Sequence, residues 1–255
     1  MAGSIRGFYP LALAEGEGVG TAYEYFAKRL VLTPFLARAG CLDRVLIAGL
    51  PEKYGASLDF LLLAAGSGAR VLVMDDRPEA LAAARRALAK AQDAGLLRGI
   101  DPDYRVGDLA EPALDERFDL ALSCEVLQRL SESQRQSYWG RLRDGARAVA
   151  LFAPNGDNPA HTALSGLNGL TLAQVAALVA DAPGARCGYI DMPPFPPGIT
   201  RSEEQRARAS SGRFEALAMT GLALYARAER LFPTSMRRRN SHIVFATTLV
   251  APPGS

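Results

Sequence analysis

The stretch RVLIAGLPEKYGASLDFLLLAAGSGARVLVMDD, residues 44–76, decides the fold of this chain. Its two ends, 44–50 and 69–76, are short apolar runs closed by a glycine or by acids, as in strands buried on both faces of a parallel sheet. The middle, 57–68, is apolar and ends in glycines, which is typical of a helix and its stop. The stretch therefore predicts a strand, a helix and a second strand.

The same alternation continues along the chain. Residues 79–95 favour a helix that Pro78 begins, and Ser131 is a suitable N-cap for a helix over 131–145. Further strands are expected at 104–108, 117–127, 146–155, 185–192 and 241–250, and further helices at 21–39, 170–182 and 201–232. Strand–helix alternation at this spacing predicts an α/β fold, a mostly parallel sheet with helices on both faces.

Two of the expected helices carry further detail. Pro34 should bend or split the helix over 21–39. The helix within 201–232 has a helical-period stripe made of Phe214, Leu217, Ala218, Gly221, Leu222 and Tyr225, which should pack on its own domain or on a second subunit.

Composition narrows the class of protein. The 255 residues are 49% hydrophobic, enough for a sizeable core and too many for a disordered chain. Lys and Arg total 29 against 27 Asp and Glu, a balance that argues against a nucleic-acid partner. The apolar stretch 60–65 is far shorter than the ~20 residues of a membrane span, and no signal peptide is evident. A cytoplasmic protein without a membrane partner is expected.

The three cysteines are Cys41, Cys124 and Cys187. Their odd number and wide spacing predict neither a disulfide framework nor a metal site, because zinc sites need clustered cysteines and histidines.

The ends of the predicted strands carry the candidate site, because ligands of open α/β sheets bind outside the carboxyl ends of the strands. Gly49 would let a ligand approach the backbone. Asp75 or Asp76 can accept hydrogen bonds from ribose hydroxyls, or can instead cap the following helix. Asp108 can accept from an exocyclic adenine amine, or can be an ordinary turn residue.

Four segments in this order are similar to a known family. VLIAGL (45–50), VLVMDDRPEALAAAR (71–85), VGDL (106–109) and FDLALSCEVLQRL (118–130) resemble class I S-adenosylmethionine-dependent methyltransferases over about residues 40–155. The resemblance implies a Rossmann-like fold with a mostly parallel seven-stranded sheet and an antiparallel last strand. It implies S-adenosyl-L-methionine as cofactor, with the glycine loop holding its amino-acid end. The implied cofactor-binding residues are Gly49, Leu50, Pro51, Asp75, Asp76, Asp108, Leu109, Ser123, Cys124 and Glu125.

The chain also departs from the family's pattern. Ile47 stands where the family has an acid, Pro51 and Lys53 stand where it has glycines, and Gln128–Arg129 replaces a His-rich end. The methionine end of the cofactor must therefore be held differently. The segment GEGVGTAYEY (16–25) is a candidate compensation, with Tyr23 or Tyr25 closing over the pocket as a lid. Packing of both tyrosines within the helix is the alternative.

The division of the chain follows from these features. Residues 1–40 are expected to form a helical lid segment and residues 41–255 the methyltransferase domain. The stretch 193–240, rich in prolines and arginines, is predicted to be an inserted element that binds the acceptor or closes over it. A solvated helix face is the alternative for those arginines. A homodimer is compatible with the sequence.

Methyl transfer needs mainly proximity and orientation, and a base only where the acceptor carries a proton to lose. His161 is the candidate base, with a structural loop histidine as the alternative, and His242 is expected to be structural. The leading hypothesis is a methyltransferase acting on a small molecule. A nicotinamide-dependent oxidoreductase and a degenerate, non-catalytic member of the fold remain as alternatives.

Overall fold

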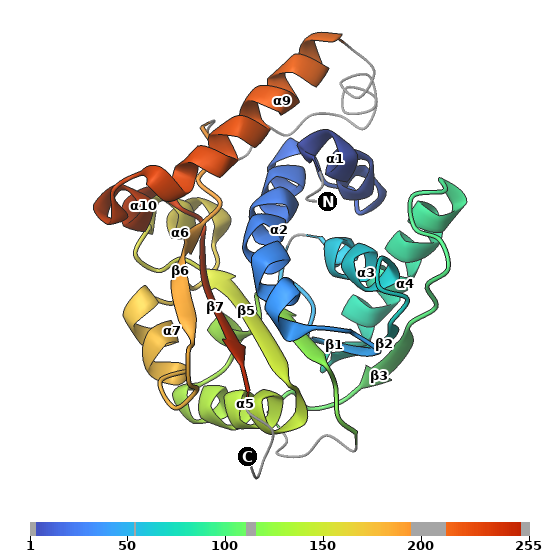
Figure 1. The fold of residues 1–255 in the computed structure, drawn as a ribbon, viewed down its shortest axis with the longest axis vertical. Coiled ribbons are helices and arrows are strands. Elements are labelled where there is room, and N and C mark those ends of the chain that lie inside the picture. The colour runs from blue at the N-terminus through green and yellow to red at the C-terminus, as the bar shows by residue number, and fades with distance from the viewer. Residues whose placement is uncertain (1–3, 54, 111–115, 195–212, 251–255) are drawn as a thin grey trace.

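The computed structural model describes residues 4–53, 55–110, 116–194 and 213–250. Its centre is a seven-stranded sheet in the order β3-β2-β1-β4-β5-β7-β6 (Figure 1). The strands are β1 (Arg44–Ala48), β2 (Arg70–Asp75), β3 (Asp103–Val106), β4 (Leu120–Cys124), β5 (Ala148–Pro154), β6 (Arg186–Ile190) and β7 (Ile243–Leu249). Each lies within the range expected from the sequence or one residue outside it.

The helices alternate with these strands. They are α1 (Ile5–Ala14), α2 (Val19–Ala39), α3 (Leu58–Ala65), α4 (Pro78–Asp93), α5 (Glu132–Gly145), α6 (Pro159–Ser165), α7 (Leu172–Leu178), α9 (Arg213–Ala228) and α10 (Thr234–Asn240), with 3-10 turns η1 (Leu127–Arg129) and η2 (Glu229–Leu231). No helix among these described residues is both long and apolar enough to cross a membrane.

The strand directions confirm the predicted fold class. β1 to β5 pair in parallel, and β7 runs antiparallel to both β5 and β6. In the register, Ile243 at the start of β7 pairs with Pro154 at the end of β5 and with Ile190 at the end of β6. The carboxyl ends of six strands and the amino end of β7 therefore share one edge of the sheet.

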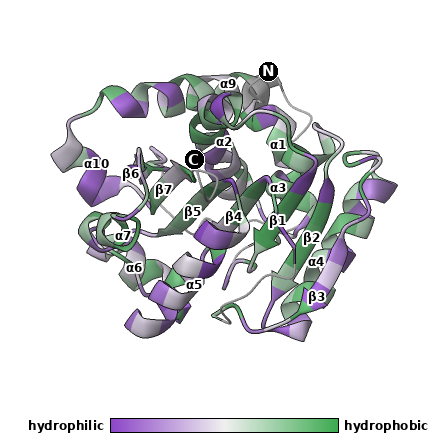
Figure 2. Cartoon of the chain, turned by 60° about the horizontal axis from the view of Figure 1, so that its bottom comes forward, coloured by the Kyte–Doolittle hydropathy of each residue, from purple (hydrophilic) through white to green (hydrophobic). Residues whose placement is uncertain are grey.

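Alternation along the strands makes two cores, one on each face. Val45 and Ile47 of β1 belong to the cluster formed with α1 to α4 and α9, whereas Leu46 and Ala48 belong to the cluster formed with α5 and α7. Both sets are buried, which is why the strands are continuous apolar runs. In Figure 2 the central strands are green and the outer faces of α4 and α5 are mostly purple or pale.

Local signals in the sequence explain several helix boundaries. Ser131 caps α5 as predicted, and its side chain and that of Gln134 form a reciprocal capping box. Pro78 stands in the first turn of α4. Pro34 does not split the helix that contains it, because α2 runs unbroken to Ala39. The helices α1, α6 and α10 were not expected.

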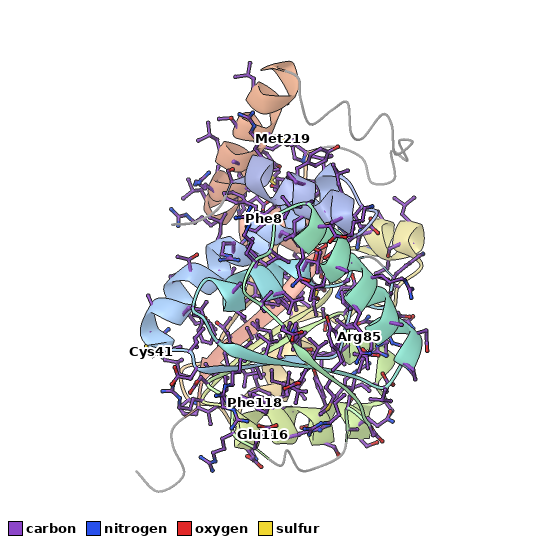
Figure 3. The ribbon with its side chains drawn as sticks, turned by 90° about the vertical axis from the view of Figure 1, so that its right-hand side faces the viewer. Phe8, Cys41, Arg85, Glu116, Phe118 and Met219 are labelled. Atoms are coloured by element: carbon purple, nitrogen blue, oxygen red, sulfur yellow. The ribbon has the colours of Figure 1, made fainter. Side chains whose placement is uncertain are left out.

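The stripe predicted on the helix within 201–232 faces the core in part: Leu222 and Tyr225 are partly buried against it, whereas Ala218 and Gly221 are exposed. Within α9 the buried residues are Met219, Ala223 and Ala226, whereas Leu217 and Leu224 are 70% and 63% exposed. The helix lies across α1 and α2 at one end of the molecule (Figure 1), with Phe8 and Met219 both at that end in Figure 3. Leu217 of the stripe and Leu224 outside it therefore point away from α1 and α2. Residues 195–212 of the predicted insertion lie outside the described part of the chain.

Candidate active site

The turn after β1 begins at Gly49, a position that only glycine can occupy without strain. Gly49 has φ +83°, and its N–H donates to the Met74 carbonyl at 2.7 Å. A Cβ at this position would lie 2.3 Å from Cγ2 of Val126 and 3.2 Å from Cδ1 of Leu109. The close approach expected of Gly49 is therefore made by Val126, a side chain of this protein.

Asp75 ends β2 and is fully buried. Its Oδ2 accepts from Leu50 N at 2.7 Å and from Arg77 Nη2 at 3.1 Å, and its Oδ1 accepts from Arg77 N at 2.9 Å and Arg77 Nε at 2.8 Å. Arg129 Nη2 adds a fifth donor at 3.4 Å. A carboxylate offers about four acceptor sites, so the chain itself saturates Asp75.

The protonation of Asp75 agrees with this. Burial acts to raise the pKa of Asp75, but the hydrogen bonds from Arg77 and Leu50 outweigh it and hold the pKa below its usual value. The carboxylate is therefore charged, and those hydrogen bonds offset the cost of its desolvation. Asp76, by contrast, is half-exposed and pairs with Arg129 Nη1 at 3.0 Å. Of the two acids predicted to meet a ribose, only Asp76 has an accessible carboxylate.

The rest of the turn is held by side chains that follow β2 and β4. Oε2 of Glu125 lies 3.1 Å from the backbone nitrogen of Glu52 and 3.5 Å from that of Lys53. Nη2 of Arg77 donates to the carbonyls of Leu50 and Pro51 at 2.8 and 3.1 Å. Backbone N–H groups that would suit a ligand's carboxylate thus face a carboxylate of this chain.

Glu125 itself is unusual. It has φ +54°, a left-handed conformation that is costly for a glutamate, directly after β4. Burial raises the pKa of Glu125 to about 8, assisted by the negative charge of Glu24 and opposed by the two backbone N–H groups. Strain and burial together mark Glu125 as a residue held in place by its surroundings.

The remaining predicted cofactor residues divide between the two faces of the sheet. Asp108 is exposed, and its Oδ1 accepts from Ala110 N at 2.8 Å. Leu109 is buried. Ser123 faces α5, and its Oγ accepts from the Tyr138 hydroxyl at 2.8 Å. Cys124 faces α2, and its Sγ lies 3.8 Å from Nζ of Lys28.

Tyr23 lies elsewhere. It is fully buried in α2, and its hydroxyl donates to Glu229. The Tyr25 hydroxyl donates to Glu15. Both tyrosines are thus packed within the helical layer in this conformation, and their predicted role as a lid stays a prediction.

A buried lysine joins α2 to the middle of this edge. Nζ of Lys28 lies 3.0 Å from Glu24 and 3.1 Å from Asp59, and the Lys28 side chain is 1% exposed. Burial acts to lower the pKa of Lys28, but the charge of Asp59 and its other anionic neighbours raise it well above its usual value. Lys28 is therefore a fixed cation that neutralises part of the surrounding negative charge.

A histidine pair lies where β5, β6 and β7 meet. Nδ1 of His242 lies 3.2 Å from Oδ2 of Asp191, and the His161 ring stacks on His242 with centroids 4.0 Å apart. Burial and the neighbouring His242 lower the pKa of His161 to about 4, so its imidazole is neutral. Burial acts to lower the pKa of His242, but Asp191 outweighs it and raises the pKa. His242, expected to be structural, is therefore the stronger base of the two.

Sequence reasoning missed the partnership of Asp191 and His242. The two residues are far apart in the chain, and antiparallel pairing of β6 with β7 brings them together, with His242 N donating to Asp191 O at 2.7 Å. The one signal was that both stand at predicted strand ends on the edge where ligands bind.

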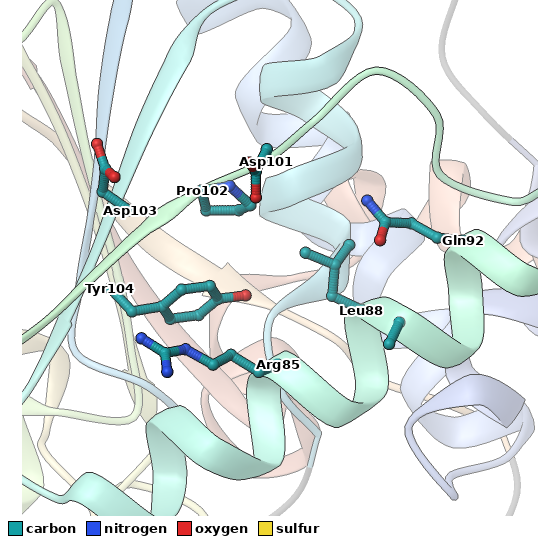
Figure 4. Close-up of a pocket in the computed structure, with 8 residues that line it drawn as sticks. Arg85, Leu88, Gln92, Asp101, Pro102, Asp103 and Tyr104 are labelled. Atoms are coloured by element: carbon teal, nitrogen blue, oxygen red, sulfur yellow. The ribbon is translucent and has the colours of Figure 1, made fainter.

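A separate pocket lies away from this edge (Figure 4). Its volume is about 460 Å³, and it lies between α4 and the start of β3. The lining residues are Arg85, Leu88, Ala89, Gln92, Asp101, Pro102, Asp103 and Tyr104. Since β3 begins at Asp103, this pocket is at the amino end of the strand and outside the candidate site.

The family of the chain follows from its sequence as well as its topology. Residues 54–142 match the family model described as a methyltransferase domain. This match covers α3 to most of α5 and contains Asp75, Asp76, Asp108 and Glu125. Residues 54–142 are thus a methyltransferase domain of the S-adenosylmethionine-dependent kind. The match begins at residue 54, after Gly49 and the turn that follows it, where the chain departs from the family's pattern.

Solved structures share the fold of this chain. Phosphoethanolamine N-methyltransferase 2 of Haemonchus contortus, in complex with S-adenosyl-L-methionine, has 15% identity and a TM-score of 0.51, with 86% of this chain and 52% of that one covered. The methyltransferase domain of bacterial CtHen1-CN has 13% identity and a TM-score of 0.50, with 87% and 96% covered. No curated protein sequence matches the chain. These identities support the fold alone.

Proposed function

We propose that this protein transfers a methyl group from S-adenosyl-L-methionine to a small-molecule acceptor. The observation that carries the proposal is the family match over residues 54–142. When bound, the sulfonium supplies a methyl carbon to a nucleophile while the electron pair of the broken carbon–sulfur bond stays on sulfur. The protein's part is to hold the two reactants in line, since that reaction depends mainly on proximity and orientation.

The accessible acids at the strand ends fit the adenosine half of the cofactor. Asp108 and the backbone of Leu109 would meet the adenine, and the half-exposed Asp76 would meet the ribose. Asp75 has no acceptor site left and instead fixes Arg77 and the turn after β1. We assign it a positioning role.

The methionine half of the cofactor fits this turn only if side chains of the protein move out of it. The backbone N–H groups of Glu52 and Lys53 are suitable donors for the cofactor's carboxylate, and Glu125 now occupies them. Val126 fills the space in front of Gly49. Binding of the whole cofactor therefore requires Glu125 and Val126 to withdraw, which we propose happens when the ligand enters.

The same observations favour a second candidate function. A member of the fold whose turn is filled by its own side chains can serve as a binding protein without catalysis. The family match that begins only after this turn agrees with that alternative. Both candidates predict the same fold. Methyl transfer to an acceptor separates them, because a non-catalytic member can also bind the cofactor.

Thermal unfolding in the presence of S-adenosylmethionine, S-adenosylhomocysteine, NAD and NADP is the test. A ligand at a hundred times its dissociation constant adds about 2.7 kcal/mol, or roughly 5–10 °C for a chain of this size. We expect a rise with the two adenosyl-sulfur ligands that Asp76→Asn and Asp108→Asn reduce. The matched control is Glu132→Gln, because the Glu132 side chain is 85% exposed on α5. A rise with NAD alone, or with none of the four, would refute the proposal.

A further inference from the structure

Five acidic side chains gather at the carboxyl end of β4 and the neighbouring strands β5 to β7. They are Glu24 on α2, Asp59 on α3, Glu125 after β4, Asp191 after β6 and Glu229 in η2. Glu24 acts electrostatically on Asp59, Glu125, Asp191 and His242, so these groups share one region. Lys28 is the fixed cation among them, and His242 pairs with Asp191. Arg29 faces Asp59 and Arg237 faces Glu229 at the periphery.

The geometry leaves this region short of hydrogen-bond donors. Oδ2 of Asp191 pairs with His242, but its Oδ1 has no partner among the described residues, although Asp191 is only 5% exposed. Oδ1 of Asp59 is in the same situation at 3% exposure. Beside Asp191, Nδ1 of the neutral His161 also has no partner in the described structure. A buried acceptor left without a donor is costly, so such atoms indicate a missing donor.

The surroundings define the charge of that donor. Burial raises the pKa of Asp59 and Asp191, and it raises the pKa of Glu229 to about 7. Burial is the largest cause of each shift, and neighbouring acids add to it: Glu24 for Asp59 and Asp191, and Asp191 for Glu229. The acids therefore lie close enough together to disfavour one another's ionised forms, and a bound cation would relieve this. A neutral ligand would supply donors and leave this charge uncompensated. A cationic ligand with several N–H donors satisfies both needs.

We infer that the methyl acceptor is a small primary or secondary amine that enters as its ammonium ion and is bound by Asp191 and Glu24. The inference rests on the proposed function for the methyl donor, and on the geometry above for the acceptor. This inference does not use the arginines of the predicted insertion 193–240, which were expected to bind a carboxylate or phosphate of the acceptor.

An ammonium must lose a proton before its nitrogen can attack a methyl group. His242 is the nearest base to Asp191, and Asp191 accepts from its Nδ1 and fixes the ring. The proton passes from nitrogen to the imidazole, the electron pair of the broken N–H bond stays on nitrogen as its lone pair, and Asp191 stabilises the imidazolium. The groups that face His242 are Asp191 from β6, Glu24 from α2, Glu229 from η2 and His161 from α6.

Calorimetric titration of the full chain with ethanolamine, tyramine and putrescine tests the inference, each beside its alcohol counterpart and all with S-adenosylhomocysteine present and absent. We expect at least one amine to bind and its alcohol to bind at least tenfold more weakly. Asp191→Asn should weaken amine binding at least tenfold, and asparagine tolerates the φ of +65° at this position. Glu24→Gln is the second variant, and Glu132→Gln should bind like the wild type.

The binding should also displace protons, because cation binding favours the ionised form of Glu229. The apparent enthalpy at pH 7 is therefore expected to change with the ionisation enthalpy of the buffer. The inference is overturned if no amine binds, or if the amines bind no better than their alcohols. It is also overturned if Asp191→Asn and Glu24→Gln bind the amines as well as the wild type does. Amine binding without S-adenosylhomocysteine binding would instead refute the proposed function, so the two failures are distinguishable.

Discussion

Oε2 of Glu125 lies 3.1 Å from the backbone nitrogen of Glu52, so the carboxyl group of the residue after β4 accepts a hydrogen bond from the turn after β1. In the methyltransferase family this turn is the place expected to hold the amino-acid end of the cofactor. On the function proposed above, Glu125 and the cofactor's own carboxylate would compete for the same N–H groups. Cofactor affinity would then depend on a residue that the resemblance to the family assigns to the pocket floor.

Glu125→Asn is expected to raise the affinity for S-adenosylhomocysteine about 3- to 10-fold, since a shorter side chain releases hydrogen bonds worth on the order of 1 kcal/mol. Asparagine also tolerates the positive φ at this position. Isothermal titration calorimetry measures the change. Glu125→Gln, which keeps an acceptor oxygen at full length, is the control and should show less. Weaker binding by the Asn variant would mean that Glu125 holds the cofactor directly.

Asp75→Asn is expected to destabilise the fold by about 2–4 kcal/mol, because it removes the charge that balances Arg77 inside the protein. Asp76→Asn, at the half-exposed neighbour, should cost under about 0.5 kcal/mol. Urea unfolding of both variants gives the comparison. Equal stability of the two would contradict the structural role of Asp75. A variant that keeps its stability can be used to test ligand binding, so this comparison also shows which of the two acids can be tested by substitution.

Gly49→Ala is expected to cost about 2–4 kcal/mol, because alanine is strained at φ +83° and its Cβ meets Val126. The double variant Gly49→Ala/Val126→Ala should recover part of this loss by removing the clash. Denaturant unfolding of the wild type, both single variants and the double variant completes the cycle. Strict additivity would show that Val126 does not fill the space in front of Gly49.

Glu229 makes the stability depend on pH. Its pKa is raised from 4.5 to about 7 in the folded protein, chiefly by burial, so between these values the folded state holds a proton that the unfolded state has released. Stability from this group is therefore lost as pH rises from about 4.5 to 7. Glu229→Gln keeps an oxygen that can accept from Tyr23 and Met192 and carries no charge.

We expect Glu229→Gln to be more stable than the wild type at pH 8 by on the order of 2 kcal/mol, and equal to it near pH 4. Unfolding measured across pH 4–8 checks this. Glu15 and Glu125 shift stability in the same direction and His161 in the opposite one, so the difference between variant and wild type is the relevant quantity. A difference that does not change with pH would show that Glu229 titrates normally. Glu132→Gln should give a curve parallel to the wild type.

The sequence by itself determined the layered fold and the edge that carries the site. Short apolar runs such as 45–48, bounded by turn residues, are typical of strands buried on both faces. The capping box at Ser131 is a local signal that needs no tertiary context. Polar residues at the ends of those runs then locate a common edge, because parallel strands end together. These conclusions depend on periodicity and on neighbours within a few residues.

Only the tertiary structure decided what the side chains at that edge do. Asp75 and Asp76 are adjacent in sequence and equivalent by type, yet burial under Arg77 and Arg129 makes one structural and leaves the other accessible. The pairing of β6 with β7 joins Asp191 to His242, which no local pattern encodes. The reason is physical: hydrogen bonding and desolvation act between groups that are close in space, whereas sequence patterns report only on groups that are close along the chain.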